Sequence, residues 1–409
     1  MALNYSTSHL LCKVSGTTTI ISRCFSLHKL PETHKILQKT CRDFAEKELK
    51  PIASLLDREH KFPEKQIKKL AELGILGICV SKEYGGSGYD GLGMAVAVEE
   101  ISKGCAGTGA IVSIHNCLYA SLVDRLGTPD QKEQYLRAFT KGTLGCFALS
   151  EPDAGSDVGA MSCTADKDGD HYILNGNKSW VTSGLQGKAA VVFATVDKAL
   201  KHKGITAFIV PIPSQGLTLG KKEDKLGIRA SSTCNLILED VKVPKENILG
   251  SIGGGFRIAM EQLDRARVGI AAQAVGIGQA ALDLAACYSL QRKAFGKTIS
   301  ELDAVKLRLG EMALRLESAR LLVWKAAVLC DDPSRTTKET SMAKLAASEA
   351  ATFITHGAIQ VLGGMGYVSD MPAERHYRDA RITEIYGGVN DIHRMLVGSS
   401  VVKEYEVIQ

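Results

Sequence analysis

The sequence predicts a multidomain α+β fold: an N-terminal α-helical domain, a middle β-barrel or sandwich domain, and a C-terminal α domain that resembles a four-helix bundle. Two observations lead to this fold class. Apolar residues recur at the helical spacing of about 3.6 residues in the first and last parts of the chain, whereas short β-type runs with turns between them fill the middle. The chain has 409 residues, which is enough for more than one hydrophobic core. We therefore expect domains at residues 29–144, 145–250 and 251–409.

The first 25 residues are expected to be a mitochondrial transit peptide, which would place the mature protein in the matrix. Residues 1–28 contain no acidic side chain, and Lys13 and Arg23 lie among nine serines and threonines. The sequence Arg23-Cys24-Phe25-Ser26 resembles a matrix processing site with cleavage after Phe25, and removal of two basic residues lowers the net charge from +5 to +3. An ordinary N-terminal extension is the alternative. A secretory signal is disfavoured because the segment lacks an apolar core of about 7–15 residues.

Composition narrows the function classes. No run approaches the ~18 consecutive apolar residues that a membrane-spanning helix needs, so no membrane span is expected. Lysine and arginine are spread along the chain instead of forming a basic block, which gives no support for nucleic-acid binding. The eleven cysteines occur singly, without a Cys-x-x-Cys pair. This spacing predicts neither a metal site nor a disulfide framework, and it indicates a reducing compartment.

Four segments of the N-terminal domain show the helical period. They are Glu32–Ala53, a helix opened by Pro63, Leu92–Ser102 and Gln131–Phe139.

Residues 86–91, just before the predicted helix Leu92–Ser102, match the glycine pattern of a dinucleotide-binding fold. That fold also requires a βαβ unit and an acidic residue about 20 positions later, but no Asp or Glu occurs between Ile101 and Val123. The segment is therefore interpreted as a glycine-rich surface loop.

The middle domain contains predicted strands that are separated by turns, several of them with Asp-Gly, Asn-Gly or Gln-Gly pairs. The strands are His171–Leu174, Ala189–Val196, Ile205–Val210, Leu217–Leu219 and Cys234–Leu238.

After three consecutive glycines at residues 253–255, the helical period returns in three long segments that suit an antiparallel bundle. These segments are Phe256–Phe295, Glu301–Cys330 and Thr337–Leu362.

Two short segments of the middle domain carry polar groups suited to a flat heteroaromatic ligand. Leu149–Asp157 combines a proline, a glycine and small hydroxyls on a tight loop with free backbone N–H groups. Ser179–Thr182 adds the indole of Trp180 and a hydroxyl. Taken alone, each segment is better explained structurally, as a helix-capping loop and a core tryptophan respectively.

Together with four further motifs, these segments resemble one family, the acyl-CoA dehydrogenases, and within it the short-chain mitochondrial branch. The further motifs are residues 220–232, Arg292–Gly296, Gln360–Tyr367 and Arg378–Gly388. The resemblance extends from about Leu30 to the end of the chain and includes motifs in all three domains.

The resemblance implies a non-covalent FAD, with its flavin between the middle and C-terminal domains, and no metal. Residues that match family positions near the flavin and the substrate thioester are Phe147, Leu149, Ser150, Trp180, Val181 and Thr182. Residues that match positions at the pyrophosphate and adenosine, partly across a subunit boundary, are Arg292, Phe295, Gln360, Gly363 and Gly364. Residues that match the acyl-CoA site are Ser156, Asp264, Arg267, Gly387 and Gly388. A cofactor site shared between subunits implies a homotetramer.

The family's catalytic base is missing from its expected position. In most members a carboxylate follows the Ile-Tyr pair and removes the α-proton of the substrate. This chain has Gly387 there, and the base position of a smaller set of relatives is Ala266. Val389 and Asp303 replace the Thr and Gln of the family pattern, which is expected to remove a hydrogen bond and to weaken FAD binding. Nearby carboxylates that could substitute for the base are Glu261, Asp264, Glu384 and Asp391.

These motifs support two functional hypotheses. The first is FAD-dependent α,β-dehydrogenation of short-chain acyl-CoA to 2-enoyl-CoA in fatty-acid β-oxidation, slow without its base, with electrons passed to electron-transfer flavoprotein. The second is a catalytically impaired flavoprotein that binds acyl-CoA as a sensor, a sink or a tetramer partner. Gly387 motivates the second, although its N–H group would still polarise the thioester carbonyl. An oxygen-dependent acyl-CoA oxidase is excluded because it would need a longer chain than 409 residues.

Overall fold

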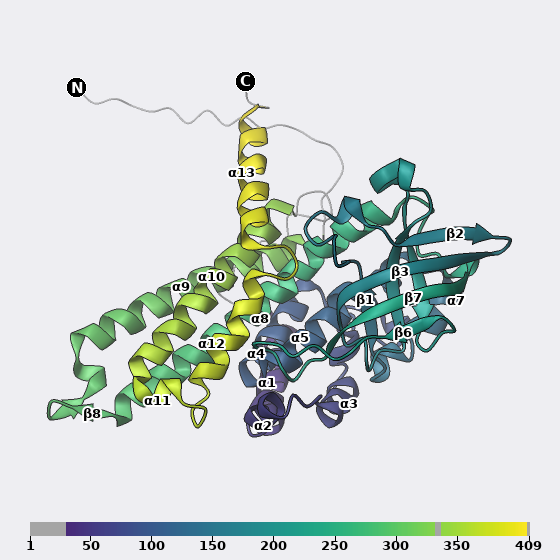
Figure 1. Cartoon of the computed structure of the whole chain (residues 1–409). Coiled ribbons are helices and arrows are strands. Elements are labelled where there is room, and N and C mark those ends of the chain that lie inside the picture. Colours follow the sequence, from purple (N-terminus) through teal and green to yellow (C-terminus); the bar gives the residue numbers. More distant parts are fainter. Residues whose placement is uncertain (1–29, 332–336, 407–409) are drawn as a thin grey trace, which may run out of the picture.

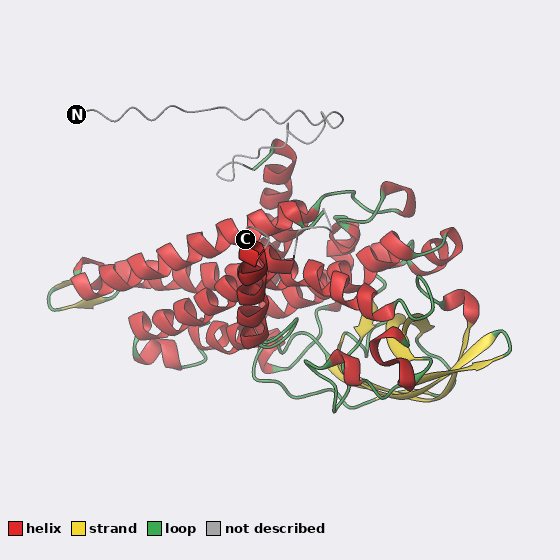
Figure 2. Cartoon of the chain, turned by 90° about the horizontal axis from the view of Figure 1, so that it is seen from above, coloured by secondary structure: helices red, strands yellow, loops and turns green. Residues whose placement is uncertain are grey.

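The computed structural model describes residues 30–331 and 337–406. The predicted transit peptide lies outside these residues. In the described part, helices precede and follow a single large sheet (Figure 1), in agreement with the predicted fold class. Figure 2 shows the sheet at one side of the molecule and the long C-terminal helices extending away from it.

The N-terminal region consists of short helices around α4, most of whose residues are buried. The helices are α1 (Glu32–Phe44), α2 (Ala53–Arg58), α3 (Glu64–Glu72), α4 (Gly91–Gly104), α5 (Ala106–Ile114), α6 (Ser121–Leu126) and α7 (Pro129–Tyr135). The predicted helix from Glu32 to Ala53 is interrupted, because a π-helical turn at Ala45–Leu49 follows α1. Asp90 caps α4 by accepting a hydrogen bond from the Gly93 N–H at 2.9 Å. The glycine-rich segment is therefore a loop before a helix, and in the described chain no strand precedes it.

The middle region is one curled, mixed sheet of seven strands. The strands are β1 (Gly145–Ala148), β2 (Thr164–Asp168), β3 (His171–Thr182), β4 (Ala189–Thr195), β5 (Ile205–Pro211), β6 (Leu217–Leu219) and β7 (Thr233–Pro244). They are ordered β1-β4-β2-β3-β7-β6, with β5 paired to β4. The long strands β3 and β7 extend beyond their predicted ranges because their pairing continues across two register shifts, one of them between Lys178 and Val181.

The C-terminal region is a helical bundle in which α10 packs against α8, α9 and α12. Its helices are α8 (Gly255–Gln291), α9 (Asp303–Leu329), α10 (Thr337–Leu362), α11 (Gly364–Tyr367), α12 (Ala373–Arg381) and α13 (Asn390–Glu406). The first helix ends before its predicted limit, because Arg292 is extended and a two-stranded hairpin follows, β8 (Lys293–Ala294) and β9 (Lys297–Thr298). Phe295 lies at the tip of this hairpin with a φ of 53°, so its apolar side chain is not part of the helix.

The N-terminal and C-terminal helices share one hydrophobic core. A Cβ atom on Gly276 of α8 would lie 2.3 Å from the carbonyl oxygen of Glu99 in α4. Glycine at this position therefore allows the two helices to pack closely. Gln273, one turn earlier, donates a hydrogen bond to the Ala106 carbonyl at 2.9 Å, which fixes α5 to the same face of α8.

Two helical stretches have the length and composition of a membrane span, Ala106–Leu126 and Gly255–Gln291. In the structure, 94% and 61% of their most apolar windows are buried. Core helices of a protein meet the same test, and α8 packs against α4, α5 and α10 within the structure.

The loop before β7 docks the sheet onto the bundle. The Ile228 N–H donates to the Asp379 carboxylate of α12 at 2.5 Å, and the neighbouring Arg378 forms an ion pair with Asp57 at 2.6 Å. Burial raises the pKa of Asp379 to about 6. Two of the motifs, residues 220–232 and Arg378–Gly388, are thereby brought into contact, although 151 positions separate the bonded residues Ile228 and Asp379.

Candidate active site

Trp180 lies at a bulge that turns its side chain outward. Between Lys178 and Val181, β3 contains one residue more than the facing stretch of β7. Trp180 has a φ of 61°, a left-handed conformation that is unfavourable for any residue with a Cβ. Its side chain is 66% exposed. β-Bulges re-aim side chains beside binding sites, so an indole held outward at a cost in backbone energy fits the predicted contact with a flat ring.

The loop after β1 is hydrogen-bonded to this bulge. The Ser179 N–H donates to the Ser150 carbonyl at 2.8 Å. Phe147 at the end of β1 is half-buried and packs against the Phe193 ring, with centroids 5.0 Å apart. The two segments singled out from the sequence therefore lie side by side. Six of the predicted flavin contacts are in these segments: Phe147, Leu149, Ser150, Trp180, Val181 and Thr182.

Two of the predicted ligand contacts in this region differ in exposure. The Val181 side chain is fully buried in the core of the sheet, so only its backbone can face a ligand. Ser156, in contrast, is exposed on the loop between β1 and β2, so its side chain is accessible to a ligand.

The remaining predicted cofactor residues lie elsewhere in the chain. Figure 1 places β8 and α11 at the end of the bundle that points away from the sheet. The five residues there are all exposed: Arg292, Phe295, Gln360, Gly363 and Gly364. Phe295 is 90% exposed at the hairpin tip. The structure therefore does not bring these residues together with Trp180 in a single chain.

Residues 385–389, here called the base loop, connect the 3₁₀ turn Ile382–Glu384 that follows α12 to α13, and they contain the expected base position. Gly387 and Gly388 have φ values of 68° and 103°, which favour glycine. Arg267 of α8 lies with its Nε 3.4 Å from the Gly387 carbonyl oxygen and forms an ion pair with Asp264 at 2.5 Å. Thr337 donates to the other Asp264 oxygen at 2.7 Å. The predicted substrate residues Asp264, Arg267, Gly387 and Gly388 are thus brought together.

Lys344 of α10 is fully buried beneath the same loop. Its ammonium donates to the Gly388 carbonyl at 2.8 Å and to the Asn390 side chain at 2.9 Å. Burial lowers the pKa of Lys344 to about 7; the charge of Glu384 opposes this shift and that of Arg267 adds to it. Sequence analysis did not identify Lys344, because a lysine on an amphipathic helix is usually solvated.

A Lys344→Met variant is expected to change how stability depends on pH. Between pH 7 and pH 10.5, Lys344 is protonated in the unfolded chain, where its pKa is 10.5, but not in the folded chain. Because the unfolded state binds the extra proton, the free energy of unfolding rises with pH in this range. The free energy of unfolding of wild type minus that of the variant should rise with a slope of up to about 1.4 kcal/mol per pH unit. Urea denaturation from pH 7 to pH 9.5 measures it.

The control for this experiment is Lys338→Met on the same helix. Lys338 pairs with Glu404 at 2.7 Å, and this hydrogen bond raises its pKa. The difference between wild type and Lys338→Met should therefore stay constant up to pH 9.5. A flat difference for Lys344→Met as well would show that Lys344 is charged throughout this range.

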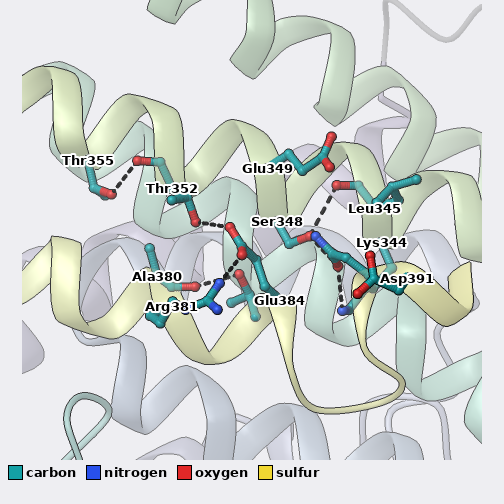
Figure 3. Close-up of polar contacts among 12 residues, drawn as sticks. Lys344, Leu345, Ser348, Glu349, Thr352, Thr355, Ala380, Arg381, Glu384 and Asp391 are labelled. Carbon is teal, nitrogen blue, oxygen red and sulfur yellow. Dashed lines mark hydrogen bonds and ion pairs between the residues drawn. The ribbon is translucent and has the colours of Figure 1, made fainter. Parts of the chain in front are cut away.

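The four candidate substitutes for the base are all engaged in other interactions. Glu261 pairs with Arg125 at 2.9 Å and Asp264 with Arg267. Figure 3 shows Glu384 held by Thr352 of α10 and by Arg381. Asp391 is 88% exposed and pairs with Arg394 at 2.9 Å. A carboxylate that is ion-paired or solvated is a weaker base than one held in a dry pocket.

The structure shows where the other residues that depart from the family pattern lie. Ala266 is a residue of α8 that is buried in the hydrophobic core shared by the helices. Val389 directly follows Gly388 in the loop and is half-buried. Asp303 is exposed at the first residue of α9, with Lys306 3.4 Å away. A cation close to Asp303 offsets part of the negative charge that this residue brings.

His393 of α13 also lies under the base loop and was not found by sequence analysis. Its ring is fully buried, and neither nitrogen has a hydrogen-bond partner in the described part of the chain. Burial, with Arg267 and Lys344 nearby, lowers its pKa to about 4. A substrate contacts only atoms that solvent can reach, so neither His393 nor Lys344 can take the α-proton without movement of the loop.

A cavity of about 280 Å³ is formed in part by the loop between β1 and β2. It is lined by residues 159–162, by Thr195 and Ile205, and by Lys198 and Lys201. Two lysines among the lining residues suit an anionic ligand. Sequence analysis did not mark these lysines, which lie in a short 3₁₀ segment between β4 and β5.

Comparison with protein-family models identifies the class of protein. The N-terminal, middle and C-terminal domains of acyl-CoA dehydrogenase match residues 31–143, 146–241 and 253–402. The chain therefore belongs to the acyl-CoA dehydrogenase family, a family of enzymes that oxidise acyl-CoA with FAD.

Individual relatives and solved structures resemble this chain over more than nine-tenths of its length. The chain is 57% identical to the mitochondrial short-chain specific acyl-CoA dehydrogenase of Bos taurus over 378 residues, 92% of either chain. Among solved structures, butyryl-CoA dehydrogenase from Megasphaera elsdenii has a TM-score of 0.90 at 41% identity, covering 91% of this chain and 99% of that one. A glutaryl-CoA dehydrogenase from Mycobacterium smegmatis in complex with FADH2 has a TM-score of 0.86 at 29% identity, covering 91% and 95%.

FAD is the cofactor of this enzyme family, and the residues of this chain fit it. The outward-facing indole of Trp180 and the hydroxyls of Ser150 and Thr182 suit a flat, polar heteroaromatic ring. Within the described residues, no group of three or more His, Cys, Asp or Glu side chains is arranged to hold a metal ion.

Proposed function

We propose that the protein is a mitochondrial matrix homotetramer that dehydrogenates short-chain acyl-CoA to 2-enoyl-CoA in β-oxidation and passes electrons to electron-transfer flavoprotein. We further propose that it does so slowly, because it lacks the usual base. The observation that carries the proposal is the position of Trp180, which is exposed and has a strained backbone. Its neighbour Ser179 is hydrogen-bonded to Ser150 in the loop after β1. All three regions of the chain also match the family. We place its domains at residues 29–144, 145–250 and 251–409, after a transit peptide of residues 1–25.

The residues of the base loop bind and polarise the substrate in this proposal. FAD, when bound, accepts a hydride from the substrate β-carbon. The Gly387 N–H donates to the thioester carbonyl oxygen, which makes the α-proton more acidic. Arg267, itself held by Asp264, approaches the Gly387 carbonyl, and Lys344 binds that of Gly388, so the peptide groups of the loop are fixed in place.

The rate of the reaction is limited by proton removal. A positioned general base contributes about 10²–10⁴-fold, and neither Gly387 nor Ala266 supplies one. Polarisation of the carbonyl remains, since a backbone N–H is present whatever the side chain. The expected enzyme therefore binds its substrate normally and reacts slowly.

A second candidate function is favoured by the interactions of the nearby carboxylates. Glu261, Asp264, Glu384 and Asp391 are each paired with an arginine. If none of them is released, the protein binds acyl-CoA without oxidising it and acts as a sensor, a sink or a tetramer partner of an active relative.

The proposed partners are supported by the surface of the chain. The exposed cofactor residues of β8–β9 and α11 lie far from Trp180, so a complete FAD site needs a second copy of the chain. The cavity lined in part by Lys198 and Lys201 complements the phosphate groups of coenzyme A. We therefore propose a homotetramer that binds short-chain acyl-CoA with its nucleotide end near β4 and β5.

Anaerobic mixing with butyryl-CoA tests the proposal. The FAD-loaded protein should lose its visible flavin absorbance slowly, because dehydrogenation proceeds without a positioned base. Acetyl-CoA is the control, since it has no β-carbon and cannot be dehydrogenated. A spectral shift without bleaching by butyryl-CoA would support the second candidate. Protein that stays colourless after addition of FAD would contradict both.

A further inference from the structure

A buried ion pair lies directly behind the proposed flavin contacts. Lys178, the last regularly paired residue of β3 before the bulge, is fully buried. Its ammonium lies 2.7 Å from the carboxylate of Glu151, whose side chain is 2% exposed. Sequence analysis included Glu151 in the segment Leu149–Asp157 without a role of its own, and it did not single out Lys178.

The pair connects the two segments of the flavin site. The Lys178 ammonium also donates to the Leu149 carbonyl at 3.1 Å. Glu151 in turn accepts hydrogen bonds from the N–H and hydroxyl of Ser162 at 2.6 Å each, and from the Cys163 N–H at 3.0 Å. Burial alone would raise the pKa of Glu151, but the charge and hydrogen bond of Lys178, together with the hydrogen bonds from Ser162, outweigh burial and lower it. The carboxylate therefore remains ionised opposite the lysine.

Stability alone does not explain such a pair. Two buried charges cost several kcal/mol of desolvation each, and apolar side chains of similar volume are often as stable or more so. What the pair does provide is a fixed geometry. It joins the loop that carries Leu149 and Ser150 to the strand that carries Trp180 and Thr182, at the point where the bulge begins.

We propose that Lys178 and Glu151 are positioning residues for FAD, which set the spacing between the loop after β1 and the bulge in β3. The inference rests on the proposed placement of the flavin against Trp180. Removal of the ammonium frees the Leu149 carbonyl and leaves Glu151 as an unpaired buried charge, so the loop moves relative to the indole. A displacement of about 1 Å is enough to impair a pre-organised site.

Three variants separate positioning from stability: Lys178→Met, Glu151→Gln and the double variant. Each single variant should weaken FAD binding at least tenfold and shift the visible flavin spectrum. The double variant contains no unpaired charge, so the thermal midpoint of the apoprotein should recover relative to Lys178→Met. FAD affinity and spectrum should nevertheless remain altered in the double variant, because the link between the segments is still absent.

Lys245→Met is the matched control. Lys245 lies beyond β7 and pairs with Asp170 at 2.6 Å, in an exposed ion pair at the other end of β3. This variant should leave FAD affinity and spectrum unchanged. A double variant with wild-type FAD affinity and spectrum would overturn the inference, since the pair would then act only on stability.

Trp180→Phe distinguishes failure of this inference from failure of the flavin placement. If Trp180→Phe leaves the flavin spectrum unchanged, the flavin does not lie against Trp180, and the inference falls with its premise. If Trp180→Phe alters the spectrum and Lys178→Met alters neither spectrum nor affinity, the placement stands and the positioning role is rejected.

Discussion

A Gly387→Glu variant is expected to be bleached by butyryl-CoA about 10²–10⁴ times faster than the wild-type protein, because it restores a carboxylate base at the expected position. The left-handed φ of 68° makes a side chain unfavourable here by about 1–2 kcal/mol. The new Cβ would lie 2.3 Å from Cδ1 of Ile270, the flexible end of a side chain that can turn aside. The Arg267 guanidinium, which approaches the Gly387 carbonyl, favours the ionised carboxylate. Anaerobic stopped-flow absorbance measures the rate.

Gly387→Gln is the matched control for this prediction. Glutamine has the same size and meets the same backbone strain and the same contact with Ile270, but it cannot accept the proton. Equal acceleration by both variants would show that the gain comes from reshaping of the pocket. A Gly387→Glu protein that binds FAD fully and still reacts at the wild-type rate would show that the missing carboxylate is not what limits the reaction.

A Leu307→Glu/Leu314→Glu variant is expected to dissociate the proposed tetramer and to release FAD with it. Leu307, Leu314 and Leu321 follow one another at intervals of seven residues along α9 and are 76%, 63% and 38% exposed. A stripe with this spacing is typical of a helix that packs against another. Each leucine removed from an interface costs about 1.5–3 kcal/mol, so two of them should weaken association at least 10²-fold. Analytical ultracentrifugation and FAD titration measure both effects.

The loss of FAD follows from the position of the exposed cofactor residues. Arg292 and Phe295 lie on the hairpin that leads into α9, so a change at the α9 surface separates them from the neighbouring flavin site. Ile36→Glu/Leu73→Glu is the control, since both are exposed apolar side chains of the N-terminal region, in α1 and directly after α3. A dissociated variant that keeps wild-type FAD affinity would contradict a cofactor site shared between subunits.

The elements that sequence analysis predicted best are those set by local pattern. The range Thr337–Leu362 was predicted for α10 and matches the structure, because the helical period is long and Gly363 follows with a φ of 60°. The end of α8 was predicted too late, because Phe295 continues the apolar pattern while Arg292 has already left the helix. Periodicity cannot reveal such a turn, since the turn depends on the backbone conformation of the short hairpin Lys293–Thr298.

The parts of the site that were missed depend on contacts between distant residues. Lys178 meets Glu151 from 27 positions away, and Lys344 meets Asn390 from 46. A lysine in either pattern looks like a solvated residue until the fold buries it. The glycine at residue 387, in contrast, could be singled out from the sequence, because the surrounding motif by which the chain resembles the family predicts the base position independently of the fold.

The paired glycines at residues 387 and 388 also limit which mutations this loop can accept. With positive φ at both positions, β-branched and bulky replacements are strained, and a Cβ at residue 388 would lie 2.9 Å from the His393 ring. Glutamate at residue 387 is nevertheless a short step away in the genetic code. Where Gly387 is encoded by GGA or GGG, one change in the second base yields a glutamate codon. A single nucleotide change therefore suffices to introduce the carboxylate that the resemblance leads us to expect at this position.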